Sequence, residues 1–327
     1  MSSKRSILGF VLLAFTPLFV STLFAQTPQA TNIPGIAAQA SGTYTFHIGD
    51  AQITALSDGT VPQDLHALLS NTTTGHTDEL LNKSFLVNPV ETSFNAFLLR
   101  IDGKTILVDT GSGQLFGPDY GGKLLRNLAE AGVTPDQITD VLLTHLHDDH
   151  MGGIIRDGHI VFTNATVHVG KPDLDFFLDR SNAEKAHYDI KYFNEAIQCV
   201  KPYVDGGKVK TFEGTEELFP GVTATVHPGH TPGSALYTVQ SKGQKIVFVG
   251  DIIHVASVQF PDPNITIAYD VDTKAAAQTR TQLFSEFAHD RTLIAVPHLP
   301  FPGIGHVRAV GVGYEWVPVE YANRAIK

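Results

Sequence analysis

Three histidines and two aspartates fall within seven residues, in the segment Thr144-His145-Leu146-His147-Asp148-Asp149-His150. Neutral imidazole and carboxylate groups are the usual protein ligands of zinc and similar ions, and burying so many of them without a metal would be costly. Residues two apart in an extended segment point the same way, roughly 6 to 7 Å apart. His145 and His147 can therefore bind one ion between them, while Asp149 and His150 can turn toward a second. The HxHxDH spacing predicts a metal centre suited to hydrolysis.

Other apolar runs in the chain also end in a residue that can bind a metal. The run 222–226 leads to His230, the run 246–249 leads to Asp251, and the run 293–296 leads to His298. In folds with helices packed on sheets, sites form where strand ends and their loops meet, because the backbone there is rigid while the side chains project freely. We expect one ion between His145, His147 and His230. We expect a second ion between Asp149, His150 and His298, with Asp251 bridging the two.

The elements that must position these residues follow from the hydrophobic pattern. Strand-like runs cover 43–48, 52–56, 95–101, 105–108, 138–143, 161–169, 222–226, 235–239, 245–249 and 293–296, the last of which we expect to be the final buried strand. Helical spacing covers 121–131, 172–180, 189–200 and 274–289. Strands followed by helices thus occur in two successive rounds without a long linker. This order predicts an α/β fold in one domain, with two sheets packed face to face and helices outside.

The first residues resemble a targeting segment. Lys4 and Arg5 precede an apolar run over 7–24, which ends at the small residue Ala25, and these are the parts of a secretory signal. A retained membrane anchor is the alternative, but the run falls short of the ~20 clean apolar residues that a spanning helix needs. We expect a signal peptide over 1–25, a flexible lead-in or surface strap over 26–42, and the hydrolase domain over 43–327. The protein would then be periplasmic or secreted, with no membrane attachment after cleavage.

Charge and cysteine content exclude some classes of partner and of fold. The formal net charge is -10, and removing residues 1–25 takes away the two cations Lys4 and Arg5, which gives -12. An acidic surface repels phosphate backbones, so a nucleic-acid partner is not expected. The single cysteine, Cys199, allows no internal disulfide, and its helical context predicts a buried apolar role.

The motifs together resemble those of metallo-β-lactamase-fold hydrolases. They are Asp109-Thr110-Gly111 after a strand, HxHxDH with Met151-Gly152-Gly153 behind it, Gly229-His230-Thr231-Pro232-Gly233, Gly250-Asp251 and His298. Within that family, the segments 56–60, 115–118, 256–260 and 298–306 resemble methyl parathion hydrolase and its lactonase relatives. The resemblance implies an αββα sandwich of two mixed β-sheets flanked by helices, two divalent metal ions with zinc as the first expectation, and a homodimer. We expect Asp109 to support the site rather than to bind a metal.

The expected chemistry needs no serine or cysteine nucleophile. Two cations that share one water lower its pKa enough to supply hydroxide near neutral pH. We expect this hydroxide to attack a carbonyl carbon or a phosphorus, with one ion stabilising the charge that develops on the oxygen. Asp251 would act as the bridging carboxylate, and Asp149 would carry a proton to the leaving group in addition to binding a metal.

The choice of substrate depends on the walls of the pocket. Phe116, Phe177 and Phe193 match aromatic pocket positions of the relatives and would form an apolar slot, the alternative being that they are plain core aromatics. His254 lies three residues past Asp251, where the specialised pesticide hydrolase carries an aliphatic residue. Its ring should crowd a tetrahedral phosphotriester while offering a hydrogen bond to a planar lactone or ester, and Ile267 would narrow the same wall.

These expectations favour a hydrolase of small-molecule lactones or aryl esters with weak phosphotriesterase activity. An organophosphate hydrolase and a quorum-quenching lactonase that acts on acyl-homoserine lactones share the metal ligands and stay open as alternatives. A true β-lactamase is disfavoured, because the common zinc β-lactamases carry other ligands at the end of HxHxDH or at the bridging aspartate. A glutathione thioesterase and a nuclease are disfavoured by the lack of a basic patch. A binding protein that keeps the metal for stability is the alternative from a different class.

Overall fold

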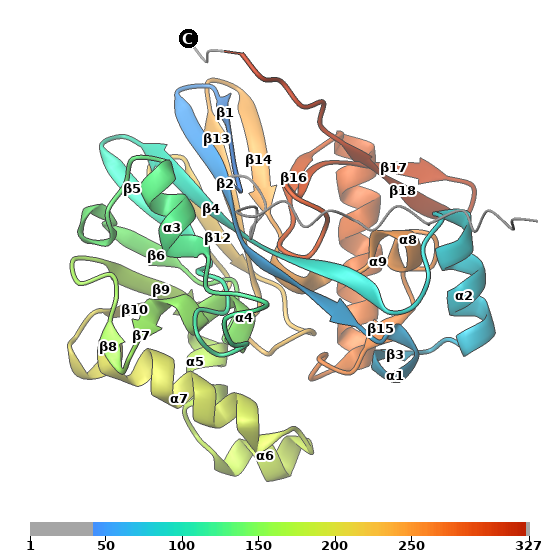
Figure 1. Ribbon diagram of the computed structural model, residues 1–327, viewed down its shortest axis with the longest axis horizontal. Coiled ribbons are helices and arrows are strands. Elements are labelled where there is room, and N and C mark those ends of the chain that lie inside the picture. The colour runs from blue at the N-terminus through green and yellow to red at the C-terminus, as the bar shows by residue number, and fades with distance from the viewer. Residues whose placement is uncertain (1–41, 325–327) are drawn as a thin grey trace, which may run out of the picture. The chain divides into compact units, whose positions relative to one another are not determined.

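Two seven-stranded sheets pack face to face in the computed structural model, which describes residues 42–324 (Figure 1). The predicted signal peptide over 1–25 lies outside the described residues, as does the predicted lead-in up to residue 41. The described residues belong to one compact unit, Ala40–Lys327. Within this part of the chain, no helix is both long and apolar enough to cross a membrane.

The first sheet is built from the N-terminal half of the unit and is mixed. Its order is β1 (Thr43–Ile48), β2 (Ala51–Gln63), β4 (Val90–Ile101), β5 (Lys104–Val108), β6 (Asp140–Leu142), β9 (Thr166–Gly170) and β10 (Val209–Phe212). The strands from β1 to β5 pair antiparallel, whereas β5, β6, β9 and β10 pair parallel. The parallel strands place the C-terminal ends of β5 and β6 at one edge, where the metal-capable cluster begins.

The second sheet also has seven strands and is also mixed. Its order is β11 (Thr215–Phe219), β12 (Val222–Val226), β13 (Ala235–Ser241), β14 (Gln244–Phe248), β16 (Leu293–Ala295), β17 (Ile304–Val310) and β18 (Gly313–Pro318). Only β14 and β16 pair parallel in this sheet as described. Two short pairs, β3 (Leu69–Ser70) with β15 (Thr266–Ile267) and β7 (Ile155–Arg156) with β8 (His159–Ile160), lie outside both sheets.

Helices cover the outer face of each sheet. The described helices are α1 (Leu65–Leu68), α2 (Thr74–Lys83), α3 (Leu124–Glu130), α4 (Asp148–Met151), α5 (Lys171–Phe177), α6 (Ser181–Ala186), α7 (Ile190–Asp205), α8 (Ala256–Gln259) and α9 (Thr273–Asp290), with 3-10 turns at Pro135–Gln137, Gly152–Ile154 and Gly250–Ile252. The side chains of Asp189 and Asp272 accept hydrogen bonds from the first turns of α7 and α9, which fixes where these long helices begin.

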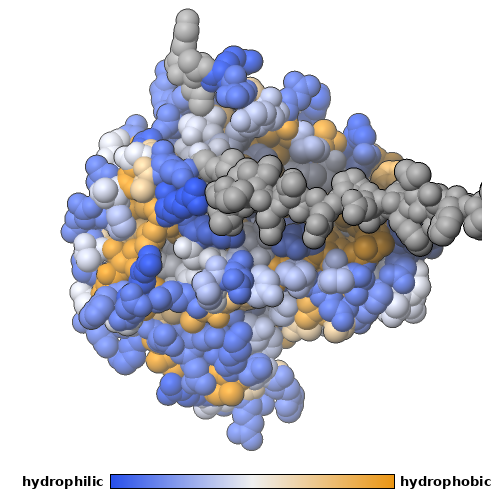
Figure 2. Space-filling view, in the orientation of Figure 1, coloured by the Kyte–Doolittle hydropathy of each residue, from blue (hydrophilic) through white to orange (hydrophobic). Residues whose placement is uncertain are grey.

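Three apolar layers separate the four structural layers. On β5, Ile106 and Val108 face the second sheet, while Leu107 faces the helices α3, α5 and α7. On β14, Ile246 faces the first sheet and Val247 faces α9. Both faces of each central strand are therefore buried, which explains why these strands have nearly continuous hydrophobic sequences. The side of the unit seen in Figure 2 carries mainly hydrophilic residues with scattered apolar patches.

The αββα prediction is confirmed by this arrangement. Most predicted elements are present within a few residues, and the strands Thr43–Ile48 and Val222–Val226 match their predicted bounds. The predicted buried strand at 293–296 is present as β16, but two strands that the sequence does not predict, β17 and β18, follow it and pair as a hairpin at the edge of the second sheet. An edge hairpin is exposed on one side and lacks the apolar run of a central strand, so hydrophobicity alone does not reveal it.

Candidate metal centre

Seven side chains from both sheets meet at one edge of the sandwich. His145 and His147 follow β6, and His147 also caps the start of the short helix α4, which carries Asp149 and His150. The loop after β12 supplies His230, the turn after β14 supplies Asp251, and the loop after β16 supplies His298. Each ligand therefore stands just beyond the end of a buried strand, as the sequence predicts.

The first group consists of His145, His147, His230 and Asp251. His145 Nε2 lies 3.0 Å from His147 Nδ1 and 3.2 Å from His230 Nε2, and the last two atoms lie 3.0 Å apart. Asp251 Oδ2 lies 3.2 Å from His230 Nε2 and 3.6 Å from His145 Nε2. Ligands bound to zinc at 2.0–2.1 Å in a tetrahedron are about 3.3 Å from one another. The four atoms thus have the spacing of a tetrahedral metal site.

Hydrogen bonds to the far side of each ring determine which nitrogen faces the group. Asp270 Oδ1 accepts from His230 Nδ1 at 2.8 Å. Tyr188 Oη donates to the carbonyl of Tyr269 at 2.7 Å, so it accepts from His147 Nε2 at 2.9 Å. Burial lowers the pKa of His145 and His147 well below its usual range. Neutral rings held in this way present their lone pairs to one another, an arrangement that is repulsive until a cation lies between them.

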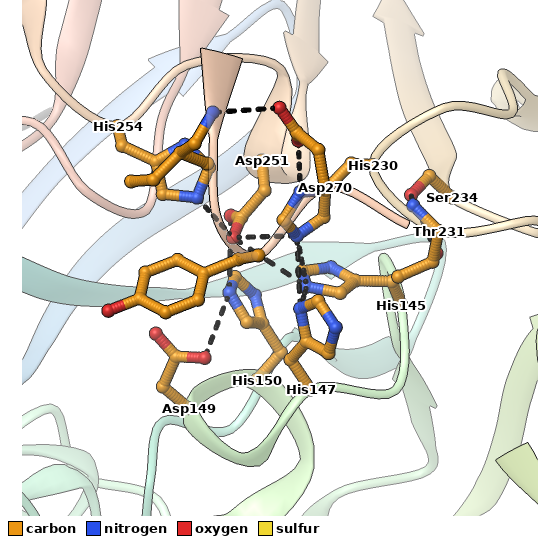
Figure 3. A network of polar contacts seen from close by, with 12 residues as sticks. His145, His147, Asp149, His150, His230, Thr231, Ser234, Asp251, His254 and Asp270 are labelled. Atoms are coloured by element: carbon orange, nitrogen blue, oxygen red, sulfur yellow. Dashed lines mark hydrogen bonds and ion pairs between the residues drawn. The ribbon is translucent and has the colours of Figure 1, made fainter. Parts of the chain in front are cut away.

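The second group shares Asp251 with the first. His150 Nε2 and His298 Nε2 lie 3.3 Å apart, and Asp251 Oδ1 lies 3.1 Å from the former and 3.0 Å from the latter. Asp149 completes the group, with one carboxylate oxygen 3.5 Å from His150 Nε2 and the other 3.5 Å from His298 Nε2. Asp251 thus contacts both groups, and its Oδ2 also lies 3.1 Å from His298 Nε2, so this carboxylate is placed to bridge them (Figure 3).

The carboxylates make the centre attractive to positive charge. Although burial lowers the pKa of His230, the carboxylates of Asp251 and Asp270 raise it to about 9. Burial raises the pKa of Asp251, but His150 and His298 outweigh it and hold that pKa well below its usual range. Asp251 is therefore ionised, and a divalent cation supplies the positive charge that these groups favour. The donor set of imidazole and carboxylate fits zinc and related divalent ions.

Two buried aspartates connect the loops that carry the ligands. Asp109, at a positive φ of 56° after β5, accepts from Thr144 N at 2.8 Å and from His150 Nδ1 at 2.9 Å. It supports the site from behind, in the role expected from the sequence. Asp173 on α5 accepts from Leu146 N, Thr231 Oγ1 and Gly233 N, and so joins the HxHxDH loop to the His230 loop. Burial raises the pKa of Asp173 to about 6.

Comparison with known proteins agrees with this geometry. Residues 92–298 match the model of the metallo-beta-lactamase superfamily. The chain belongs to this superfamily. A solved structure described as the hydrolase AbOPH in the beta lactamase superfamily is 39% identical, with a TM-score of 0.83 over 88% of this chain and 100% of that one. AidC, described as a dizinc quorum-quenching lactonase, is 27% identical, with a TM-score of 0.78 over 86% of this chain and 99% of that one.

A curated superfamily member, the N-acyl homoserine lactonase of Bacillus thuringiensis, is 30% identical over 155 residues, which cover 42% of this chain and 54% of the lactonase. The chain spans about half or less of the length of the first curated relatives that it matches. The comparisons thus place the chain in the superfamily, with lactonases among its relatives.

The two groups of metal-capable residues border a cavity of about 140 Å³. Its wall consists of Gln63, Phe116, His147, Asp148, Asp149, Lys191, Tyr192, Asp251, His254, Tyr269 and His298. Two of the five residues predicted for the substrate pocket, Phe116 and His254, therefore line it. Burial lowers the pKa of His254 to about 4, so its ring is neutral at the cavity wall.

The other three residues predicted for the wall lie behind it. Phe177 and Phe193 are fully buried and pack on each other at 5.3 Å between ring centroids, in the layer between the first sheet and α5 and α7. Phe177 reaches the site only through His147, 5.6 Å away between ring centroids. Ile267 is also fully buried, on the two-residue strand β15. These positions correct the wall prediction, because helix or strand spacing marks a residue as inward-facing without saying whether it meets a cavity or the core.

Sequence reasoning missed several polar residues of the site. Lys191 Nζ lies 3.0 Å from Asp148 Oδ2 at the cavity rim, 5.8 Å from the centre of the Phe116 ring. Tyr192 and Tyr269 add two hydroxyl-bearing rings to the wall. One sequence signal could have indicated two tyrosines of the site. Tyr188 and Tyr192 lie on either side of Asp189, the N-cap of α7, and aromatic residues beside a helix cap are suited to lining a site rather than facing solvent.

A larger cavity of about 330 Å³ lies elsewhere, between the loop after β5 and the start of α3. Its wall includes Asp58, whose carboxylate already accepts hydrogen bonds from Ser112, Gly122 and Leu124. Neither group of metal-capable residues borders it. The smaller cavity therefore marks the reactive site, because it alone of the two opens onto the ligand cluster.

Proposed function

We propose that the protein is a binuclear metal-dependent hydrolase that opens lactones or cleaves aryl esters and has weak phosphotriesterase activity. One observation carries the proposal: two ligand groups share Asp251 directly beneath a cavity whose wall includes Phe116 and His254. The first group would hold one divalent ion and the second group the other, with zinc as the proposed metal.

Bound ions would lower the pKa of a water held between them and polarise the oxygen of the substrate. The chain itself supplies the geometry for this reaction. Asp251 fixes the positions of the two ligand groups relative to each other, because its oxygens contact both. Asp149, with 14% of its side chain exposed, is more open to the cavity than Asp251 at 3%. We propose that Asp149 passes a proton to the departing alkoxide or phenolate.

The size and shape of the cavity support planar substrates over tetrahedral ones. A space of about 140 Å³ is small for a dialkyl aryl phosphate. The ring of His254 occupies one side of it, while Phe116 offers an apolar face for an aryl or acyl group. A lactone or aryl ester can lie flat between these two rings, whereas the alkyl groups of a phosphotriester project in three directions and meet His254.

The acyl-homoserine lactones form a second candidate substrate class. The 27% identity to the lactonase AidC over 86% of this chain supports it, and so does the 30% identity to the lactonase of Bacillus thuringiensis. The amide of such a substrate could accept a hydrogen bond from Lys191 or a tyrosine at the cavity rim. An organophosphate hydrolase of the methyl parathion type is the third candidate, and the resemblance of the segments 56–60 and 298–306 favours it.

The test is a comparison of kcat/KM for one preparation of metal-loaded protein. We expect the value for dihydrocoumarin or phenyl acetate to exceed the value for methyl parathion. A higher value for methyl parathion would reverse the assignment, and cleavage of long acyl-homoserine lactones without dihydrocoumarin would favour the second candidate. Asp251→Ala should abolish every activity, and turnover by that variant would refute the shared-carboxylate mechanism.

The variant His254→Leu tests how the cavity selects its substrate. We expect the ratio of kcat/KM for dihydrocoumarin over methyl parathion to fall, because the smaller branched side chain leaves room for the alkyl groups of the phosphotriester. The ratio cancels any change in the amount of active protein. An unchanged ratio would show that His254 does not discriminate between the two classes.

Export and a homodimer stay predictions. N-terminal sequencing of the native protein would test the first, and light scattering would test the second.

A further inference from the structure

We infer that His254 is an additional metal ligand, which binds through Nε2 the ion that His298 and Asp251 hold. This inference rests on the proposed metal centre and is independent of the substrate class. His254 lies outside the HxHxDH pattern and the other ligand motifs, so the sequence predicts it as a wall residue only.

The first observation is that His254 is buried without hydrogen-bond partners. It is 3% exposed, Nδ1 has no hydrogen-bond partner among the described residues, and the one polar contact of Nε2 there is the ion pair with Asp251, which lacks hydrogen-bond geometry. A buried polar group without a partner costs roughly 1–3 kcal/mol. Such groups are rare in folded proteins, and where they occur a bound ion or water often satisfies them. An imidazole with a free lone pair beside a metal centre is best satisfied by the metal.

The second observation is the position of the ring. His254 Nε2 lies 3.1 Å from Asp251 Oδ2, and His298 Nε2 also lies 3.1 Å from that oxygen. These spacings match those between ligands of one ion at 2.0–2.1 Å, which are about 3 Å. The ligand atoms of Asp251, His254 and His298 all lie within 4.8 Å of one another. Figure 3 shows His254 directed at Asp251 from the side opposite His145.

The third observation is that the ring is held in place. Its plane is within 11° of that of His298, at 5.1 Å between centroids. The backbone N–H of His254 donates to Gln259 Oε1 at 2.8 Å, and Gln259 Nε2 donates to the carbonyl of Ile265 at 3.1 Å. Gln259 is itself fully buried. The side chain is thus fixed against a ligand of the second group by contacts that do not use its ring nitrogens, which leaves them available.

A further ligand has a chemical consequence for the second position. Asp149, His150, His298 and the bridging Asp251 already supply four protein atoms. A fifth reduces the number of places open to solvent or substrate, so the second ion would be held more tightly and would act mainly in structure and charge stabilisation. Ions that accept five or six ligands would gain more from it than ions that prefer four.

The experiment measures metal binding rather than activity. Apo wild type, His254→Leu and His254→Asn are titrated with Co²⁺ and Zn²⁺, and the loss of the second ion to a chelator is followed by elemental analysis. Loss of residues that merely support a ligand costs 10–100-fold in metal affinity. We therefore expect both variants to bind the second ion at least about tenfold more weakly. The visible bands of the second Co²⁺ should become more intense, since they strengthen as the coordination number falls.

Tyr269→Phe is the matched control, because Tyr269 lies beside His254 on the same wall, 6.0 Å away between ring centroids. It should leave both affinities and the cobalt spectrum unchanged. His254→Asn keeps a polar side chain and decides the question if the leucine variant does not fold. An affinity within about twofold of wild type, with an unchanged cobalt spectrum, would overturn the inference even if the substrate ratio changed. That result would leave the proposed hydrolase function intact.

Discussion

Replacement of Asp270 by alanine should damage both the fold and the metal centre. Asp270 is 5% exposed and accepts hydrogen bonds from His230 Nδ1 at 2.8 Å and from Ile267 N at 3.1 Å. The guanidinium of Arg280, which is fully buried, lies 3.7 Å from Asp270 Oδ2, the oxygen that also accepts from Ile267 N. The rest of that guanidinium donates to backbone carbonyls. Asp270 is thus the carboxylate that balances Arg280 and also orients a metal ligand.

The magnitude follows from these two roles. Removing one partner of a buried ion pair costs about 3–5 kcal/mol of folding free energy, since the other charge stays buried without a counter-charge. The 3.7 Å separation places Asp270→Ala at the lower end, at roughly 3 kcal/mol in the apo protein. Loss of the hydrogen bond to His230 Nδ1 should weaken the first metal by about 10–100-fold. That corresponds to about 1.4–2.7 kcal/mol less stabilisation by excess metal.

Urea unfolding measures both effects, once with a chelator and once with excess zinc. The apo difference between wild type and Asp270→Ala reports on Arg280, and the additional difference with zinc reports on His230. Asp290→Ala is the matched control, because Asp290 pairs with His289 at the same 2.8 Å but in an exposed position, and it should change neither value measurably. Apo stability within about 1 kcal/mol of wild type, together with unchanged zinc affinity, would refute the assignment of both roles.

Three other substitutions test two supports of the site and one buried ion pair away from it. Tyr188→Phe removes the acceptor of His147 Nε2–H, so zinc affinity should fall about tenfold while the melting temperature of the apo protein changes little; Tyr192→Phe on the same wall is the control. Asp173→Ala removes the link between Leu146, Thr231 and Gly233 and should cost roughly 3–5 kcal/mol, a cost under about 1 kcal/mol being contrary to the proposed link. Asp140 should govern acid stability: burial raises its pKa, but hydrogen bonds from His168 and Lys104 outweigh this and lower it to about 2. Its stabilisation is therefore present above about pH 4 and lost as the pH falls toward 2, so Asp140→Asn should flatten the unfolding free energy measured between these pH values.

The structure brings the predicted ligand residues together because their positions obey a local rule. Each of His145, His230, Asp251 and His298 follows a short apolar run, and parallel or sheet-paired strands bring such ends to one edge. The αββα layers follow in the same way from strands whose two faces are both buried. Both inferences use only spacing and hydrophobicity, which are visible in a single sequence.

The residues that orient the ligands do not obey such a rule. Tyr188, Asp173 and Asp270 are 41, 27 and 40 residues away in sequence from the groups they contact, His147, Leu146 and His230. Each is a single residue in a segment without a motif, and its role depends on how the chain returns to the site. Phe177 and Phe193 show the opposite error, because their inward-facing spacing suggests a place at the cavity although they pack in the core.

The support of the metal centre is spread over elements that do not line the cavity. Asp109 follows β5, Asp173 is on α5, and the carbonyl of Ser93 on β4 accepts from His298 Nδ1 at 2.9 Å. The cavity wall can therefore vary, and with it the substrate, without disturbing most ligands. His254 is the exception, because its ring belongs to the wall while its free nitrogen lies 3.1 Å from the bridging carboxylate. A substitution there should change substrate preference and metal retention together, which makes this position a constraint on how far the specificity of the enzyme can change.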